Sequence, residues 1–335
     1  MRGFVHWRSK RSSRCRHATA RSTRCGNGRL QFPQVFGPRP YLHGATREIT
    51  GSTWRAISMT TGGNRCISGR NAAPIHEARL LIQVIRIPTV DLPILYVVSN
   101  GVAEIEINRR ERRNALDDNA YTMLREAFSD AENDPDVRVL LVRGQTDMFT
   151  AGKDLKSESV AREGYRPVLT FMDTVNVLTK PLMAAVAGPA MGMGTTLLYH
   201  CDVVYAASNA IFGMPFTRIG VSPEFGSSRL APMTAGYRLA AEAMLFAETF
   251  DADHALRTGL VNRVLPPEKL FVYARERAEK LAAMPAAAVV KTKALLKNHA
   301  FAGMNALFRS ELYEFETLLG SAESRAIVAG FGRKN

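Results

Sequence analysis

The segment that decides the fold is GPAMGMGTT, residues 188–196. It follows an apolar run over residues 182–186 and precedes a helical pattern that ends near Cys201 and Asp202. Gly192 and Gly194 fit a tight turn at a helix N-terminus, where backbone N–H groups have no intrahelical partner and can face a ligand. Close packing of the helix against the strand would also explain these glycines. Their order matches neither the dinucleotide-binding pattern nor a phosphate-binding P-loop.

The elements around this turn alternate between strands and helices. Asn100-Gly101 is a strong hairpin signal between two β-rich runs. The predicted strands are residues 94–98, 102–107, 137–142, 182–186 and 202–206. The predicted helices are residues 117–133, 237–248, 268–283, 286–298 and 305–319. This order predicts an α/β fold, in which the helical end of the chain forms a cap or an assembly region.

The positive charge of the chain is confined to its first ninety residues. Residues 1–90 hold 15 arginines and one lysine but only two acidic side chains, a net charge of +14 within the total of +13. The other residues hold 28 basic and 29 acidic side chains, a net charge of −1. Binding to a phosphate backbone needs a basic surface, so the balanced part of the chain is not expected to bind nucleic acid.

Residues 1–90 show no sustained helical or strand period and are predicted to be a basic, disordered extension. An Arg- and Ser-rich, acid-poor segment is also typical of an organellar transit peptide, and an Arg-rich arm could bind nucleic acid. Upstream sequence translated from a misplaced start, with Met59 as a later initiator, is a further interpretation. We expect a cytoplasmic protein, or a mitochondrial one if the extension is a transit peptide.

The remaining composition excludes two classes of site. No stretch approaches the ~18 consecutive apolar residues of a membrane helix, so no membrane partner is expected. No spacing of His, Cys, Asp and Glu indicates a metal site. Cys201 lies in an apolar context without a second nearby cysteine, which is typical of a buried small hydrophobe. His200 and His254 are interpreted as structural residues.

A second small-residue segment is FTAGKDL, residues 149–155, which is predicted to follow a strand and to begin a helix. Its small residues let backbone N–H groups approach a ligand. An ordinary strand-to-helix turn, with Asp154 at the helix start, would give the same pattern.

The third segment is GVSPEFGSS, residues 220–228, shortly after FGMPF at residues 212–216. Ser222, Pro223 and Glu224 have the order of a helix start, with an N-cap, proline at the first helical position and an acid in the first turn. Glu224 also has apolar neighbours, which would raise its pKa and suit it to carry a proton. The two interpretations shift this pKa in opposite directions. Ser227 and Ser228 have no evident His partner for nucleophilic catalysis and are interpreted as helix-start residues.

These segments, in this order, resemble the crotonase (enoyl-CoA hydratase/isomerase) superfamily over about residues 91–335. RRERRNAL at residues 109–116 looks like the segment ahead of the first active-site helix. FTAGKDL and GPAMGMG look like the two oxyanion loops of the family, and GVSPEFGSS like the stretch that positions its catalytic acid. The resemblance implies a spiral of ββα units over residues 91–265 and a C-terminal helical trimerisation region over residues 266–335.

The resemblance also implies an acyl-CoA substrate and a site for it. In the family the thioester oxygen lies between two backbone N–H groups, which fall here on Lys153 and Met193, with their side chains free to vary. Coenzyme A would lie along residues 113–116 and 151–155, and it is part of the substrate, so no cofactor is expected. The implied partner is a further copy of the chain, as a homotrimer or a hexamer of stacked trimers. The implied substrate contacts are Arg113, Ala115, Leu116, Ala151, Gly152, Asp154, Leu155, Gly192 and Gly194.

Departures from the family pattern bear on the reaction. The two glutamates of family hydratases fall on Thr196 and Phe216, which cannot deprotonate a water molecule. Glu224 matches the single glutamate of the Δ3,Δ2-enoyl-CoA isomerases, which carries a proton from C2 to C4 of a 3-enoyl thioester. Phe216, Phe225 and Met193 are then expected to line a dry acyl pocket. The sequence therefore predicts an enoyl-CoA isomerase with Glu224 as its base.

Two alternatives stay open at this point. One is another reaction of the same superfamily, by an atypical enoyl-CoA hydratase or an acyl-CoA thioester hydrolase. The other is a non-catalytic, RNA-binding relative, for which the Arg-rich residues 1–90 are the support.

Overall fold

The computed structural model describes residues 45–50, 53–56, 92–155 and 165–330. The larger part of the predicted extension, including Met59, lies outside these ranges. Two short strands within it are described, β1 (Ala45–Thr50) and β2 (Thr53–Ala56). β1 pairs antiparallel with β2 and with β3 (Ile94–Ser99). The prediction of no regular structure therefore does not hold at these residues, because strands of 6 and 4 residues are too short to show a sustained period.

The hairpin signal at Asn100-Gly101 is confirmed. Asn100 and Gly101 both have positive φ, at 50° and 75°, which is the conformation that a two-residue turn with the twist of a β-ribbon needs. The turn joins β3 to β4 (Val102–Ile107) in antiparallel register.

Parallel strands extend the sheet from β4. They are β5 (Val139–Arg143), β6 (Leu182–Val186), β8 (Val203–Ala207) and β11 (Arg263–Leu265). The strand order is β11-β8-β6-β5-β4-β3-β1-β2. All five side chains of β6 are buried, as expected for a strand covered on both faces.

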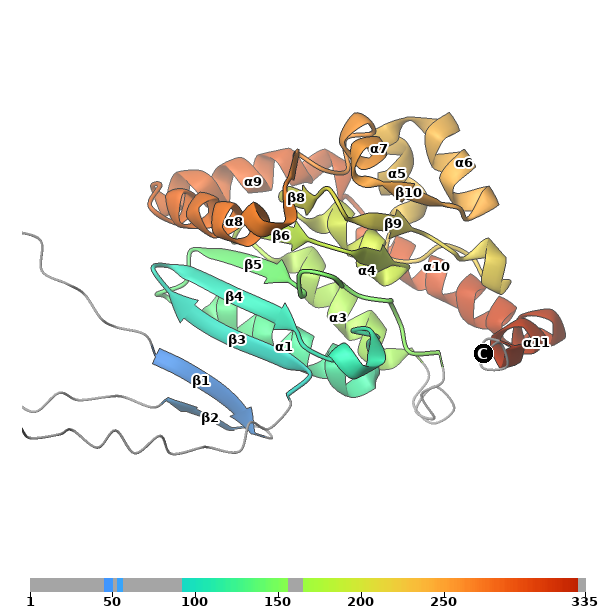
Figure 1. Ribbon diagram of the computed structural model, residues 1–335, viewed down its shortest axis with the longest axis horizontal. Helices are drawn as coiled ribbons and strands as arrows, with labels where there is room; N and C mark the ends of the chain where they lie inside the picture. The colour runs from blue at the N-terminus through green and yellow to red at the C-terminus, as the bar shows by residue number, and fades with distance from the viewer. Residues whose placement is uncertain (1–44, 51–52, 57–91, 156–164, 331–335) are drawn as a thin grey trace, which may run out of the picture. The chain divides into compact units, whose positions relative to one another are not determined.

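Helices cover the two faces of this sheet. The side chains of β5 show which helix packs on which face. Leu140 and Val142 join the apolar cluster that contains Leu124 and Phe128 of α1 (Asp118–Asn133). Leu141, one position away, joins the cluster formed with α8 (Pro267–Ala282). Alternate side chains of a strand point to opposite faces, so α1 and α8 lie on opposite faces of the sheet. α3 (Arg166–Val177) contacts α1 (Figure 1).

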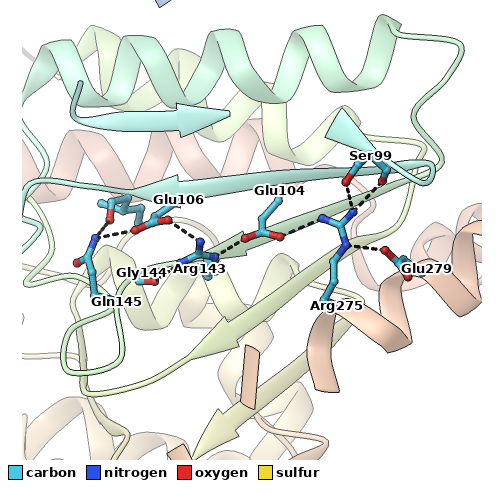
Figure 2. A network of polar contacts seen from close by, with 9 residues as sticks. Ser99, Glu104, Glu106, Arg143, Gly144, Gln145, Arg275 and Glu279 are labelled. Carbon is cyan, nitrogen blue, oxygen red and sulfur yellow. Dashed lines mark hydrogen bonds and ion pairs between the residues drawn. The ribbon is translucent and has the colours of Figure 1, made fainter. Parts of the chain in front are cut away.

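A polar network fixes α8 to the sheet (Figure 2). Glu104 on β4 accepts from Arg143 on β5 at 2.5 Å and from Arg275 on α8 at 3.0 Å. Arg143 also pairs with Glu106 at 2.6 Å, and Glu106 accepts from Gln145 at 3.2 Å. Because these partly buried charges are paired with one another, they add orientation to the apolar contacts of α8.

A second, smaller sheet carries the decisive segment of the sequence (Figure 1). Its order is β10-β9-β7, with β7 (Pro189–Met191) parallel to β9 (Ile211–Gly213) and β10 (Thr249–Asp251) antiparallel to β9. Gly192 is the one residue between β7 and α4 (Met193–Thr196). α4 continues directly into the 3-10 helix η2 (Leu197–His200).

The remaining helices complete the chain. They are η1 (Arg110–Arg112), η3 (Thr217–Ile219), α5 (Ser227–Ala235), α6 (Tyr237–Phe246), α7 (Ala252–Arg257), α9 (Ala286–Ala300), α10 (Met304–Leu319) and α11 (Ala322–Gly330). The predicted α/β class and the helical C-terminal region are confirmed, and the five strands and five helices predicted with residue ranges have their ends within two residues of those observed. α8 packs on the sheet, so this first helix beyond residue 265 is part of the core. Over the described residues, no helix has the length and apolar character needed to span a bilayer.

Candidate active site

The two predicted oxyanion loops lie side by side. Thr150 donates its N–H to the carbonyl of Pro189 at 3.0 Å, and Met191 donates to the carbonyl of Thr150 at 2.9 Å. These two bonds form a parallel bridge between Thr150 and Ala190. The residues that follow on each chain, up to Lys153 and Met193, are therefore brought to the same place. The helix expected to begin at the first loop would fall on residues 156–164, outside the described residues.

Two glycines turn the backbone just before the predicted donors. Gly152 has a φ of +87° and lies so close to the second loop that a Cβ would be 2.7 Å from the carbonyl oxygen of Met191. Gly192 has φ 54° and ψ −117°, a region open only to glycine, and it is the N-cap of α4. Each glycine therefore sets the direction of the next N–H group.

The N–H groups of Lys153 and Met193 are available to a ligand. Met193 is the first residue of α4, so its N–H has no partner within the helix. Neighbouring amides are engaged, because Gly192 donates to the carbonyl of Gly213 at 2.8 Å and Asp154 donates to that of Leu116 at 2.9 Å. Among the described residues, neither Lys153 nor Met193 has a backbone acceptor for its N–H.

A buried asparagine supports the first loop. Asn114, with a φ of 56°, donates its side-chain amide to the carbonyl of Phe149 at 3.0 Å and to Gln145 at 2.7 Å. Thr150 in turn donates its hydroxyl to the carbonyl of Asn114 and accepts the N–H of Gly152 at 3.0 Å. Gln145 belongs to the network in Figure 2, so polar contacts run from α8 to the loop that carries Lys153.

A cavity of about 320 Å³ opens beside the two amides. It is lined by Ala151, Gly152, Lys153, Leu155, Met191, Gly192, Met193, Pro215, Phe216, Arg218, Ile219, Glu224 and Phe315. Most of these side chains are apolar, and among the described residues Glu224 is the one carboxyl in the lining. The cavity can therefore hold an apolar acyl chain with one acid–base group against it.

The environment of Glu224 decides between the two interpretations of this residue. Glu224 is 4% exposed, and its carboxyl has no hydrogen-bond partner among the described residues. Burial raises its pKa to about 7, the charge of Lys153 opposes this rise, and the charge of Glu311 adds to it. A carboxyl with this pKa exchanges a proton readily at neutral pH.

The interpretation of Ser222 as a helix N-cap is wrong. α5 begins at Ser227, the Ser222 hydroxyl has no partner among the described residues, and Gly226 is the N-cap. Phe225 and Gly226 both have positive φ, at 60° and 69°, which ends the extended chain after Glu224 and delays the helix. The prediction that Ser227 and Ser228 start a helix is confirmed.

The turn that carries Glu224 is held from two sides. Glu311 on α10 accepts the N–H of Gly226 at 2.6 Å and the N–H of Ser228 at 3.2 Å, so it replaces the missing cap. The ring of His200 stacks on that of Phe225, and its Nε2 is 2.7 Å from the carbonyl oxygen of Phe225. Burial lowers the pKa of His200 to about 3, so this residue is a neutral, structural histidine, as predicted.

Most of the predicted site residues meet at the cavity, and the others lie around it. Lys153, Met193, Glu224, Phe216 and the loop residues Ala151, Gly152, Leu155 and Gly192 all line it. The prediction that Phe225 lines it is wrong, because this ring packs in the core among His200, Phe171 and Phe308. Gly194 is behind the lining, where a Cβ would be 2.5 Å from the side chain of Thr150.

The two predicted coenzyme A segments pair with each other through their backbones. Ala151 donates to the carbonyl of Arg113 at 3.0 Å, and Leu116 donates to that of Gly152 at 2.8 Å. Arg113 is exposed, Ala115 is half-buried and Leu116 is fully buried. Asp154 is 4.0 Å from Arg109. Residues 113–116 and residues 151–155 of the first loop thus form one continuous rim.

Sequence reasoning missed several residues of the lining. Met191 and Pro215 adjoin predicted residues and could have been included on that ground. Phe315 comes from α10, about 90 positions after Glu224, and nothing local in the sequence marks it. Its ring contacts Tyr165 at 5.1 Å between centroids. Among the described residues, no group of three or more His, Cys, Asp or Glu side chains could hold a metal ion.

Comparison with known proteins identifies the family. The model of the enoyl-CoA hydratase/isomerase family matches residues 98–333 of this chain. The chain belongs to this family. The match includes both predicted oxyanion loops, Glu224 and the C-terminal helices, and the recognition of the crotonase superfamily is confirmed.

Individual relatives of the family carry both activities in their names. A crotonyl-CoA hydratase of Syntrophomonas wolfei is 34% identical over 199 residues, which cover 58% of this chain and 76% of that protein. An enoyl-CoA delta isomerase 2 of Rattus norvegicus is 32% identical over 214 residues, 62% of this chain and 54% of that protein. The crystal structure of an enoyl-CoA hydratase/isomerase from Pseudoalteromonas atlantica superposes with a TM-score of 0.70 at 34% identity, over 73% of this chain and 98% of that one.

Proposed function

We propose that this family member is an enoyl-CoA isomerase that moves the double bond of a 3-enoyl-CoA to the 2-position. The observation that carries the proposal is the position of Glu224. It is a buried carboxyl with a pKa of about 7, in the same apolar cavity as two backbone amides. Among the described residues, neither the carboxyl nor these amides have a hydrogen-bond partner.

The first step removes a proton from C2 of the thioester. The Glu224 carboxylate takes the proton, and the electrons of the broken C–H bond form a dienolate whose negative charge is on the thioester oxygen. The N–H groups of Lys153 and Met193 donate to this oxygen. Donors already fixed in place and directed at a developing charge lower the barrier, and one such donor typically contributes ~3 kcal/mol.

The second step returns the same proton to C4. The electrons of the dienolate re-form the carbonyl and the new C2–C3 double bond, and the electrons of the former C3–C4 double bond take the proton from the Glu224 carboxylic acid. The net reaction changes no oxidation state and consumes no water, so one carboxyl and two amides suffice. A pKa near 7 lets the same group accept and release the proton.

Hydration of a 2-enoyl-CoA is the competing reaction, and the names of several relatives favour it. The side chains argue against it in this chain. Thr196 is fully buried and outside the cavity lining, and Phe216, which lines the cavity, has no acid group that could hold a water molecule. The apolar lining offers few partners for a nucleophilic water molecule.

A substrate panel separates the two reactions. Purified protein is given 3-enoyl-CoA and 2-enoyl-CoA of the same chain length, and the products are identified by chromatography and mass. We expect conversion of the 3-enoyl thioester to the conjugated isomer, with water addition to the 2-enoyl thioester slower by at least about a hundredfold, the scale of one missing acid–base group. Faster water addition than isomerisation would reject the proposal.

The assembly and ligand predictions are part of the same proposal. Coenzyme A would lie along the rim formed by residues 113–116 and 151–155, as part of the substrate. The homotrimer or hexamer is supported by large apolar side chains that are exposed in the single chain, among them Leu245, Phe246, Leu295 and Leu296 at 69–75%. Sedimentation of the full chain tests the assembly.

A further inference from the structure

The side chain of Lys153 is not free, although its backbone alone was expected to matter. It is 7% exposed, and its Nζ is 3.1 Å from Oδ1 of Asp118, the first residue of α1. Lysine side chains are rarely buried without a reason, because removing the ammonium from water costs several kcal/mol unless it is paired. The prediction that this side chain can vary freely is therefore inconsistent with its surroundings.

Two aromatic rings complete the surroundings of the ammonium. Its Nζ is 4.7 Å from the ring centre of Tyr165 and 5.3 Å from that of Tyr121, within the range of cation–π attraction. The hydroxyls of both tyrosines are buried and have no hydrogen-bond partner among the described residues. Burial and the charge of Glu224 raise the pKa of both phenols, so both stay neutral.

The ammonium and the Glu224 carboxyl belong to one site. Lys153 and Glu224 line the same cavity, and the charge of Lys153 lowers the pKa of Glu224 against the effect of burial. Among the described residues, the groups around the carboxyl from other elements give it no second buried positive charge. His200 from η2 is neutral, Glu311 from α10 is an acid, and Arg218 of η3 lines the cavity but is exposed.

We propose that Lys153 acts twice, its N–H holding the thioester oxygen while its side-chain ammonium keeps the buried Glu224 carboxyl ionisable and so able to act as a base. The inference rests on the proposed function. Asp118 and the two tyrosine rings hold the ammonium in place. Because its side chain acts on the substrate only through Glu224, the Lys153 side chain has a positioning role. Without this charge, burial and Glu311 would leave Glu224 protonated at neutral pH.

The test is a titration of the Glu224 carboxyl that needs no substrate. Lys153→Met keeps the backbone N–H and removes the charge, whereas Lys153→Arg keeps both. The C=O band of the protonated carboxyl is followed by infrared difference spectroscopy against pH, with the matching Glu224→Gln proteins subtracted to isolate this one group. We expect a midpoint near pH 7 in the unchanged protein and in Lys153→Arg, and a midpoint at least about one unit higher in Lys153→Met.

A second buried lysine provides a matched control. Lys293 on α9 is 5% exposed and pairs with Asp202 at 2.7 Å, but it does not line the cavity. Lys293→Met should lower stability and leave the Glu224 midpoint where it is. If Lys153→Met does not fold, Lys153→Gln, which can still donate to Asp118, takes its place with the same expected shift. An unchanged midpoint in the Lys153 variant, or an equal shift in the Lys293 variant, would overturn the inference.

The titration and the substrate panel fail independently. If the panel shows no isomerisation but the midpoint moves as expected, the proposed function is wrong and the electrostatic role of Lys153 stands. If isomerisation is found but the midpoint does not move, Lys153 contributes only its backbone. In an active protein, the acid limb of kcat/KM should also move upward with Lys153→Met, which a purely structural role would not produce.

Discussion

Glu311 accepts the backbone N–H of Gly226 at 2.6 Å, two residues after the carboxyl that we propose as the base. The bond joins α10, near the end of the chain, to a turn in which Phe225 has a φ of 60°. A bulky residue in that conformation is strained and persists only where its surroundings hold it. Glu311 on one side and His200 on the other supply that support. The C-terminal helical region therefore shapes the site of its own chain.

Replacing Glu311 by Ala should lower both stability and turnover. The change removes the acceptor for two N–H groups at the start of α5, of which that of Gly226 is buried, and this should reduce the free energy of unfolding by about 1–3 kcal/mol. Release of the turn should reduce kcat about tenfold or more, because Glu224 loses its fixed position. Chemical denaturation and steady-state kinetics measure the two effects. Glu314→Ala, an exposed acid on the same helix, should do neither, and equal effects of the two variants would contradict the role of Glu311.

Gly192→Ala should impair the oxyanion site through the backbone conformation, not through a steric clash of the added methyl group. A Cβ at this position meets nothing within 4 Å, but φ 54° with ψ −117° is closed to alanine, so the backbone must move and turn the Met193 N–H away. We expect kcat to fall about a hundredfold, as for loss of one oxyanion donor. Gly236→Ala is the matched control, with φ +83° and equally open space, but remote from the loops. It should cost stability and leave kcat within about twofold, and a similar loss of kcat in both variants would refute the role of the loop.

The rate should rise with pH through the titration of Glu224. The first step needs the carboxylate, and burial raises the pKa of this group to about 7. We therefore expect kcat/KM for a 3-enoyl-CoA to increase about tenfold per pH unit below this pKa and to level off above it. A rate that is constant between about pH 5 and pH 8 would show that another group, or none, provides the base.

Glu224→Gln should stabilise the protein, and more so at higher pH. The folded-state pKa of about 7 lies above the ordinary glutamate pKa of 4.5, so the folded protein binds the proton more tightly than the unfolded chain does. The resulting penalty is absent below about pH 4.5, grows as the pH rises, and is complete above about pH 7, where it reaches about 3 kcal/mol. Denaturation of both proteins between pH 5 and pH 8 measures this difference. A constant difference between them would mean that Glu224 has an ordinary pKa.

The elements and the two loops could be predicted from the sequence because their signals are local. Asn100-Gly101 marks a turn that needs two positive φ angles, and the continuous apolar run of β5 marks a strand buried on both faces. Gly192 marks a conformation that other residues avoid. In each case the residue type and the backbone geometry are linked within a few positions, so the sequence is sufficient.

The support of the site could not be predicted, because it depends on contacts between distant residues. Ser222 has the local chemistry of an N-cap, but Glu311, 85 positions after Gly226, takes that role. Phe225 looks like a pocket residue by its place next to Glu224, but its positive φ turns it into the core. The burial of the Lys153 side chain depends on Asp118 of α1, 35 positions earlier. None of these partners is marked by a local pattern.

The measurement that bears most directly on the account is the turnover of 3-enoyl-CoA by Glu224→Gln, followed by the absorbance of the conjugated 2-enoyl thioester. Glutamine keeps the size of the side chain but cannot take the proton, so kcat should fall about a thousandfold while the thioester still binds. Binding is checked by calorimetry with a saturated acyl-CoA of the same length. A Glu224→Gln protein that binds the thioester and turns over at the rate of the unchanged protein would contradict the proposed mechanism.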